Sequence, residues 1–248
     1  MRFAFALILL ASLAACGVAP MPPSQRPAPL DVPVGPLSYE EAPMSPQMAA
    51  RTFVQVVAEV EPVAEALCRQ KRPDLNCDFQ IVVDDRSGQS PNAFHTLDQA
   101  TGRPLIGFNL PLIADARSAD ELAFVLGHEA GHHIAGHLTR TRDSAMTGAV
   151  VLGSLAAISG ADEQTIQSFS NWGATVGARR YSKDFELEAD VVGTVIAMRA
   201  GYDPVKGAGF FSRLPDPGDR FLGSHPPNAQ RIEVVRRTAN QLSGATYR

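Results

Sequence analysis

The feature that most constrains this chain is a pair of histidines four residues apart, His128 and His132, with Glu129 directly after the first. On an α-helix, positions four apart differ by about 40° in direction and about 6 Å along the axis, so both imidazoles can reach one metal ion. Glu129 lies about 100° from His128, which places its carboxylate beside that ion, where it can take a proton from zinc-bound water. The motif predicts a zinc-dependent peptidase.

The residues before the motif favour a buried helix over a chance match on a solvated one. Ser118 has the properties of an N-cap, and Glu121 three residues later completes a capping box. Apolar side chains follow at positions 122 and 124–126. We expect this helix to continue through His137.

A catalytic zinc needs a third protein ligand and an open fourth position. The metzincin pattern would place glycine one residue before Gly136 and histidine one residue after His137, so this sequence does not fit it. His133 and His137 are expected to point away from the face shared by the two motif histidines. His133 is predicted to be a surface or packing residue, and His137 could help to orient the site.

A second predicted helix, 184–200, carries Glu186, Glu188 and Asp190. With the upstream HExxH motif, this ExxxD spacing resembles the HtpX-like, Oma-like and BepA-like zinc peptidases, relatives of the CAAX prenyl proteases. The resemblance implies that Glu186 is the third zinc ligand and that Asp190, on the same helix face, orients a ligand imidazole. Glu188, about 200° from Glu186, should face elsewhere. The alternative is a solvated acidic helix face, against which the apolar neighbours argue.

Two further segments support the resemblance. His225, followed by Arg231 and Ile232, is similar to the family's HPxxxxRI segment, which implies that His225 lies near the zinc. There it would stabilise the oxyanion or occupy the fourth position at rest; the alternative is a histidine that caps a loop. Asn92 and Ala93 resemble the family's Asn-Ala-Phe segment on the strand bordering the cleft, whose backbone would pair with an extended peptide substrate.

The remaining periodicity predicts an α+β fold that is mainly helical, with a small early β-sheet bordering the active-site cleft, as in gluzincin-type zinc peptidase domains. The domain is expected to occupy residues 47–248. A small apolar helix at 145–158 is expected to be buried rather than to lean on a membrane. The other predicted elements are strands at 79–83, 93–96 and 104–109 and helices at 47–71, 162–176 and 228–242.

The first residues resemble a bacterial lipoprotein signal. Arg2 precedes an apolar run, 3–13, which is too short to cross a bilayer and ends in small residues before Cys16. The resemblance implies that residues 1–15 are a signal peptide and that Cys16 is lipidated. The alternative is an ordinary secretory signal followed by a chance cysteine.

The proline-rich segment 16–46 has few aromatic or branched apolar residues and is predicted to be an extended tether. We therefore expect a periplasmic protein anchored through Cys16, in the outer rather than the inner membrane. In such an oxidising compartment Cys68 and Cys77 would form a disulfide, the alternative being two free thiols. The net charge is −4 and no run of Lys or Arg occurs, so nucleic acid is not an expected partner.

Three functions remain open on the sequence. The first is a zinc-dependent endopeptidase, with one zinc ion per subunit, that acts on protein or peptide substrates; family and compartment imply misfolded or misassembled envelope proteins. The second is an envelope chaperone or assembly lipoprotein whose peptidase site is latent, held shut by His225. The third is a zinc hydrolase that acts on cell-wall peptides.

Overall fold

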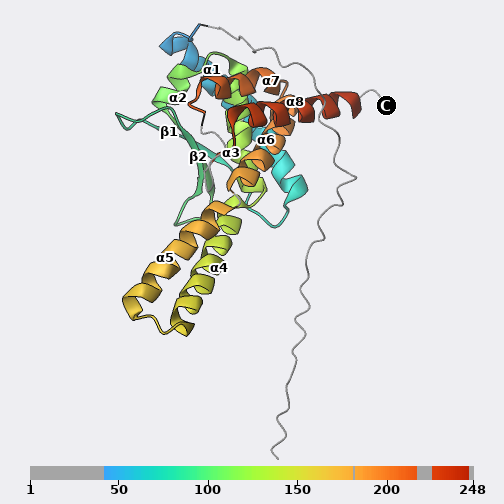
Figure 1. Cartoon of the computed structure of the whole chain (residues 1–248). Coiled ribbons are helices and arrows are strands. Elements are labelled where there is room, and N and C mark those ends of the chain that lie inside the picture. Colours follow the sequence, from blue (N-terminus) through green and yellow to red (C-terminus); the bar gives the residue numbers. More distant parts are fainter. Residues whose placement is uncertain (1–41, 181, 217–224, 246–248) are drawn as a thin grey trace, which may run out of the picture. The chain divides into compact units, whose positions relative to one another are not determined.

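A small sheet lies at one side of the helices in the computed structural model, which describes residues 42–180, 182–216 and 225–245 (Figure 1). The elements are α1 (Pro46–Lys71), β1 (Gln80–Asp84), β2 (Ala93–Leu97), β3 (Pro104–Asn109), α2 (Leu110–Asp115), α3 (Ala119–Ile134), α4 (His137–Ile158), α5 (Glu163–Arg180), α6 (Ser182–Arg199), α7 (Pro204–Gly207), the 3-10 helix η2 (Ala208–Arg213) and α8 (Asn228–Ala245). The mainly helical α+β class with an early sheet is confirmed. The predicted signal peptide, Cys16 and the predicted tether as far as residue 41 lie outside the described residues.

The sheet has the strand order β1-β3-β2, with β1 parallel and β2 antiparallel to the central strand β3. Asn109, at the end of β3, is buried and holds this end of the sheet together. Its side-chain oxygen accepts hydrogen bonds from the backbone N–H of Leu112, capping α2, and from that of Asn92. Its amide group donates to the carbonyl of Ser90. The start of β2 is therefore fixed in position by one buried side chain.

Helix α3 is the centre of the core, since 12 of its 16 residues are buried. Helices α1, α6 and α7 and strand β2 pack around it. The hydroxyl of Ser118 accepts a hydrogen bond from the N–H of Glu121, which confirms the predicted N-cap. The Glu121 carboxylate accepts from the N–H of Arg117 instead of completing the box, and it forms an ion pair with Arg213.

Glycines bring α3 and α6 close together. A methyl group at Gly127 would lie 2.9 Å from the carbonyl oxygen of Gly193, and one at Gly131 would lie equally close to that of Ala189. In the other direction, a methyl group at Gly193 would lie 2.8 Å from the backbone nitrogen of His128. Side chains on both helices, close to these glycines, can therefore meet in one site.

We expect Gly193→Ala to lower the free energy of unfolding by about 1–3 kcal/mol, because overpacking forces backbone to move where no flexible side chain can yield. Urea unfolding followed by circular dichroism measures the change. Gly244→Ala in α8 is the matched control, since nothing lies within 4 Å of its added carbon. Equal destabilisation by the two substitutions would contradict close α3–α6 packing as the cause.

The prediction that α3 continues through His137 is wrong, because α3 ends at Ile134 and Gly136 separates it from α4. This residue has φ of 70°, a left-handed conformation that favours glycine and commonly ends helices. The guanidinium of Arg72 donates to the carbonyl of Ile134 and so satisfies one group at the end of α3. Helix α4 then begins at His137 in a new direction.

Helices α4 and α5 form a hairpin whose two helices lie side by side (Figure 1). The expectation that 145–158 is buried is wrong: Ile158 is 84% exposed, and most apolar side chains of both helices face outward. The small residues of the segment instead let the two helices approach each other, Gly148 lying against Gly173. Among the described residues, no helix is long and apolar enough to cross a membrane. The exposed large apolar residues of the hairpin are Leu138, Met146, Val150, Val151, Leu155, Ile158, Phe169 and Trp172.

A disulfide between Cys68 and Cys77 confirms the predicted pairing. It links the last turn of α1 to the segment that leads into β1, and both cysteines are buried. A crosslink over so short a loop contributes about 2–3 kcal/mol in the chain-entropy treatment.

Candidate metal centre

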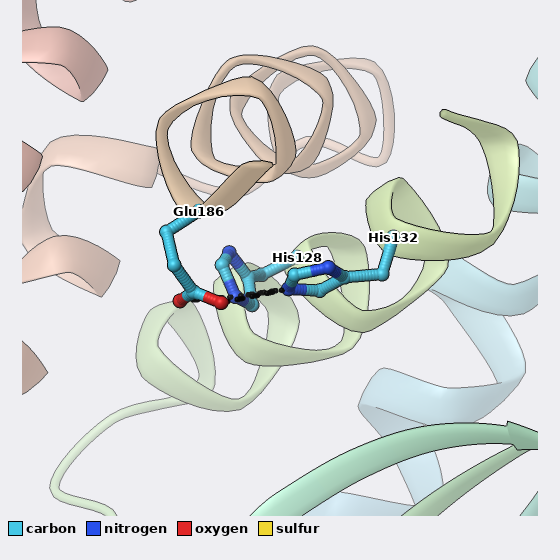
Figure 2. Close-up of side chains that lie close together, drawn as sticks. All are labelled: His128, His132 and Glu186. Atoms are coloured by element: carbon cyan, nitrogen blue, oxygen red, sulfur yellow. Dashed lines mark hydrogen bonds and ion pairs between the residues drawn. The ribbon is translucent and has the colours of Figure 1, made fainter. Parts of the chain in front are cut away.

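Three side chains from α3 and α6 converge on one point, as Figure 2 shows. The Nε2 atoms of His128 and His132 are 3.1 Å apart, and the carboxylate oxygens of Glu186 lie 3.5 Å and 3.4 Å from them. A tetrahedral zinc with ligands at about 2.1 Å holds its donor atoms about 3.4 Å apart. The predicted ligand set therefore fits a single zinc ion.

The imidazole of His128 is oriented by Asp190. The Nδ1 atom of His128 lies 2.9 Å from a carboxylate oxygen of Asp190, which is fully buried. With its proton on Nδ1, the ring presents the Nε2 lone pair toward the metal position. Two nitrogens of Arg231 hold the same carboxylate at 2.8 Å and 2.7 Å, and the guanidinium lies 3.7 Å from the ring centre of Phe211.

Arg231 is a residue of the site to which the sequence assigned no separate role. It is only 6% exposed, and it lies 3.5 Å from the carboxylate of Glu186 as well as against Asp190. The sequence signal for it was its place in the segment that resembles HPxxxxRI, six residues after His225. Its partner Asp190 lies 41 positions earlier, a separation at which spacing gives no information.

The charges of the site depend on one another. Burial and Arg231 oppose protonation of His128, yet hydrogen bonds to Asp190 and Glu186 raise its pKa to about 9. Burial favours the neutral form of Glu186, but hydrogen bonds from His128 and His132 hold its pKa well below the usual value. Bonds from Arg231 and His128 likewise lower the pKa of Asp190 against the effect of burial. Two ionised carboxylates thus face the imidazoles, an arrangement suited to a divalent cation.

A cavity of about 330 Å³ opens beside the three ligands. Glu129 lines it, as expected for a base next to the metal. His225 lines it too: its Nδ1 lies 3.1 Å from Glu186, and its side chain is 55% exposed. The remaining described lining residues include Leu112, Phe124, Val125, Phe210, Phe211, Leu214 and Pro215, so much of the wall is apolar.

The start of β2 borders the same cavity through Pro91, Asn92 and Ala93. The backbone N–H and C=O of Asn92 are both engaged by Asn109, at 2.9 Å and 3.0 Å. In an antiparallel ladder the next residue directs its polar groups to the opposite side. The N–H and C=O of Ala93 therefore face the outer edge of β2, along which none of the described strands is paired.

His133 and His137 have different surroundings. His133 is buried, its Nε2 lies 2.8 Å from the carbonyl of Asn76, and its Nδ1 lies 3.1 Å from His95; it is thus a packing residue. Burial, followed by the neighbouring histidines, lowers the pKa of His95 to about 3. His137 does not point away from the site, because its Nδ1 lies 2.9 Å from the Nδ1 of His132. The break at Gly136 is the reason.

The comparison with known proteins agrees with this geometry. The profile of peptidase family M48 matches residues 50–239, a span that includes all three ligands. The beta-barrel assembly-enhancing protease of Yersinia pestis is 27% identical over 182 residues, 66% of this chain and 37% of that protein. A Vibrio cholerae protein whose name contains the same words is 34% identical over 144 residues, 52% of this chain and 30% of that protein.

The beta-barrel assembly-enhancing protease of Escherichia coli O157:H7 is 27% identical over 137 residues, 49% of this chain and 28% of that protein. The chain thus spans about a third of the length of these curated relatives. The family profile covers most of the chain, and the donor atoms stand at the separations that zinc requires. The chain belongs to peptidase family M48 and is a zinc metalloprotease.

Proposed function

We propose that this protein is an endopeptidase of the cell envelope that cleaves misfolded or misassembled envelope proteins. The observation that carries the proposal is that β2, an edge strand among the described residues, lines the cavity of the metal ligands through Asn92 and Ala93. A strand edge pairs with the backbone of any extended peptide but not with a chain already folded. The apolar wall would receive side chains that are normally buried.

Each residue of the site has a role in hydrolysis. Zinc, when bound, polarises the scissile carbonyl and lowers the pKa of the attacking water. Glu129 takes the proton from that water and then delivers it to the leaving amine. Asp190 and Arg231 hold His128 in place. His225, three residues before α8, lines the cavity, where its imidazole would stabilise the oxyanion. The edge of β2 would hold the peptide across these groups.

Three features support a location in the cell envelope. The start of the chain resembles a lipoprotein signal, which makes Cys16 the anchor, residues 1–15 the signal peptide and residues 16–46 the tether. The disulfide between Cys68 and Cys77 is typical of proteins in oxidising compartments. Relatives carry names that refer to β-barrel assembly. We infer a periplasmic enzyme attached to the outer membrane.

The experiment is a cleavage assay on one outer-membrane β-barrel protein, presented either unfolded or folded in detergent micelles. We expect fragments from the unfolded form only, no fragments after zinc is removed by a chelator, and recovery when zinc is added back. Electrophoresis and mass spectrometry identify the products. Equal cleavage of both forms, or digestion of purified peptidoglycan alone, would contradict the proposal.

The second candidate function is a chaperone or assembly lipoprotein with a latent site. The contact between His225 and Glu186 favours it, because a side chain on a metal ligand can obstruct the open coordination position. The same assay with His225→Ala separates the two functions by the direction in which the cleavage rate changes. Cleavage falls if His225 stabilises the oxyanion, and it rises if His225 holds the site shut.

A further inference from the structure

We propose that His137 and Glu188 form a hydrogen-bonded chain that holds His132 in the orientation needed to bind zinc, which makes both of them positioning residues. The Nδ1 of His132 lies 2.9 Å from the Nδ1 of His137, and the Nε2 of His137 lies 3.1 Å from a carboxylate oxygen of Glu188. Neither residue lines the cavity. The inference rests on the zinc site and is independent of the substrate.

The protons of this chain have a single consistent arrangement. His132 uses Nε2 for the metal, so its proton is on Nδ1, from which it donates to the Nδ1 of His137. His137, accepting at Nδ1, carries its own proton on Nε2 and donates it to Glu188. The ionised carboxylate at the end makes this last bond charge-assisted and therefore stronger than a neutral one.

Packing fixes the middle of the chain. His137 is 4% exposed, and its ring stacks on that of Phe185 with centroids 4.4 Å apart and planes inclined by 11°. The guanidinium of Arg140 covers the same Phe185 at 4.3 Å and donates to Glu188 at 2.6 Å. His137 therefore cannot rotate away from His132 without the loss of a stacked ring and of its partly buried hydrogen bond to Glu188.

The arrangement complements that of the other ligand. Asp190 contacts His128 directly, because it shares the helix face of Glu186. Glu188 lies on a different face of α6, from which it reaches the second imidazole ligand only through His137. Each ligand imidazole is thus linked to a carboxylate: His128 directly to Asp190, and His132 to Glu188 through the ring of His137. Such partners keep the ligand ring oriented and increase its basicity.

The break after α3 makes this contact possible. Five residues along an uninterrupted helix correspond to a turn of about 500°, which would direct His137 well away from His132. The left-handed Gly136 ends α3 and starts α4 in a direction that returns His137 to the ligand. Gly136 thus contributes to the metal site without contacting the ligands, because it sets the direction in which α4 leaves α3.

The experiment measures the dissociation constant for zinc by competition with a chelating dye, on full-length protein at one pH. His137→Phe keeps a ring to stack on Phe185 but cannot accept from His132, and should weaken zinc binding about 10–100-fold. Glu188→Ala should reduce the affinity for zinc less, since His137 still accepts the hydrogen bond from His132. Glu188→Gln retains an acceptor oxygen and should recover part of that loss.

The matched control is His133→Phe, which removes a buried imidazole next in sequence to the ligand; among the described residues, the hydrogen-bond partners of this ring are Asn76 and His95. It should leave the zinc constant unchanged, whatever it does to urea unfolding of the zinc-free protein. Equal constants for His137→Phe and His133→Phe, or for Glu188→Ala and wild type, would overturn the inference. If His137→Phe does not fold, the zinc constants of Glu188→Ala and Glu188→Gln still test the inference, because Glu188 is half-exposed. Absence of zinc from the wild type would instead count against the metal assignment itself.

Discussion

Glu129→Gln should slow peptide hydrolysis by about 10²–10⁴-fold, the usual contribution of a general base, while the protein remains folded and binds one zinc. The amide has the size of the carboxylate but cannot accept the proton of the attacking water. Glu129 lines the cavity next to the three ligands without belonging to their cluster. Its loss should therefore affect the reaction rate and not metal binding. The rate on an unfolded substrate and the zinc content per chain are the two measurements.

Glu163→Gln is the matched control for this substitution, because Glu163 is an exposed acid in the first turn of α5, remote from the ligand cluster. It should leave rate and zinc content unchanged. A wild-type rate in Glu129→Gln would refute the assignment of the base. A parallel loss of zinc and rate would show instead that Glu129 is required to hold the metal.

Glu186→Ala should remove tight zinc binding altogether. Only His128 and His132 would remain as ligands, so the loss should exceed the 10–100-fold typical of a residue that merely orients a ligand. Zinc stabilises the folded state in proportion to the logarithm of its concentration over its dissociation constant, by about 4 kcal/mol at a thousandfold excess. Added zinc should therefore raise the unfolding temperature of the wild type and leave that of the variant unchanged.

Zinc titrations followed by thermal unfolding test this, with the Glu163→Gln variant again as control. The zinc-free forms are compared as well, because Glu186 also contacts His225 and Arg231. A variant that keeps a wild-type zinc constant would place the third ligand elsewhere.

Short-range patterns predicted most of the fold and the two histidine ligands, whereas Glu186 was named as the third ligand through the family resemblance. The helical period, the Ser118 cap and the spacing of His128 and His132 are local properties, fixed by helix geometry once a helix exists. Two short helices, α2 and α7, were not predicted although the signal was present. Each begins at a capping side chain, Asn109 or Asp203, with proline in its first turn.

The remaining features depend on contacts between distant segments. Gly136 was visible as a possible helix end, but only the direction taken by α4 shows that His137 returns to His132. The pairing of Arg231 with Asp190 likewise requires α8 to pack on α6. The exposed face of the α4–α5 hairpin contradicted the composition of its sequence, because small apolar residues can serve close helix pairing as well as burial.

The α4–α5 hairpin separates the two halves of the metal site by more than fifty positions, yet it does not determine how far apart they are. Direct contact between α3 and α6 sets that distance, and the hairpin leaves and rejoins the domain where Ser144 lies against Gly177. Beyond the first turn of α4, which carries His137 and Arg140, the hairpin is a permissive insertion. Its length and surface can diverge, or accept a fused domain, while the distances between the ligands stay unchanged.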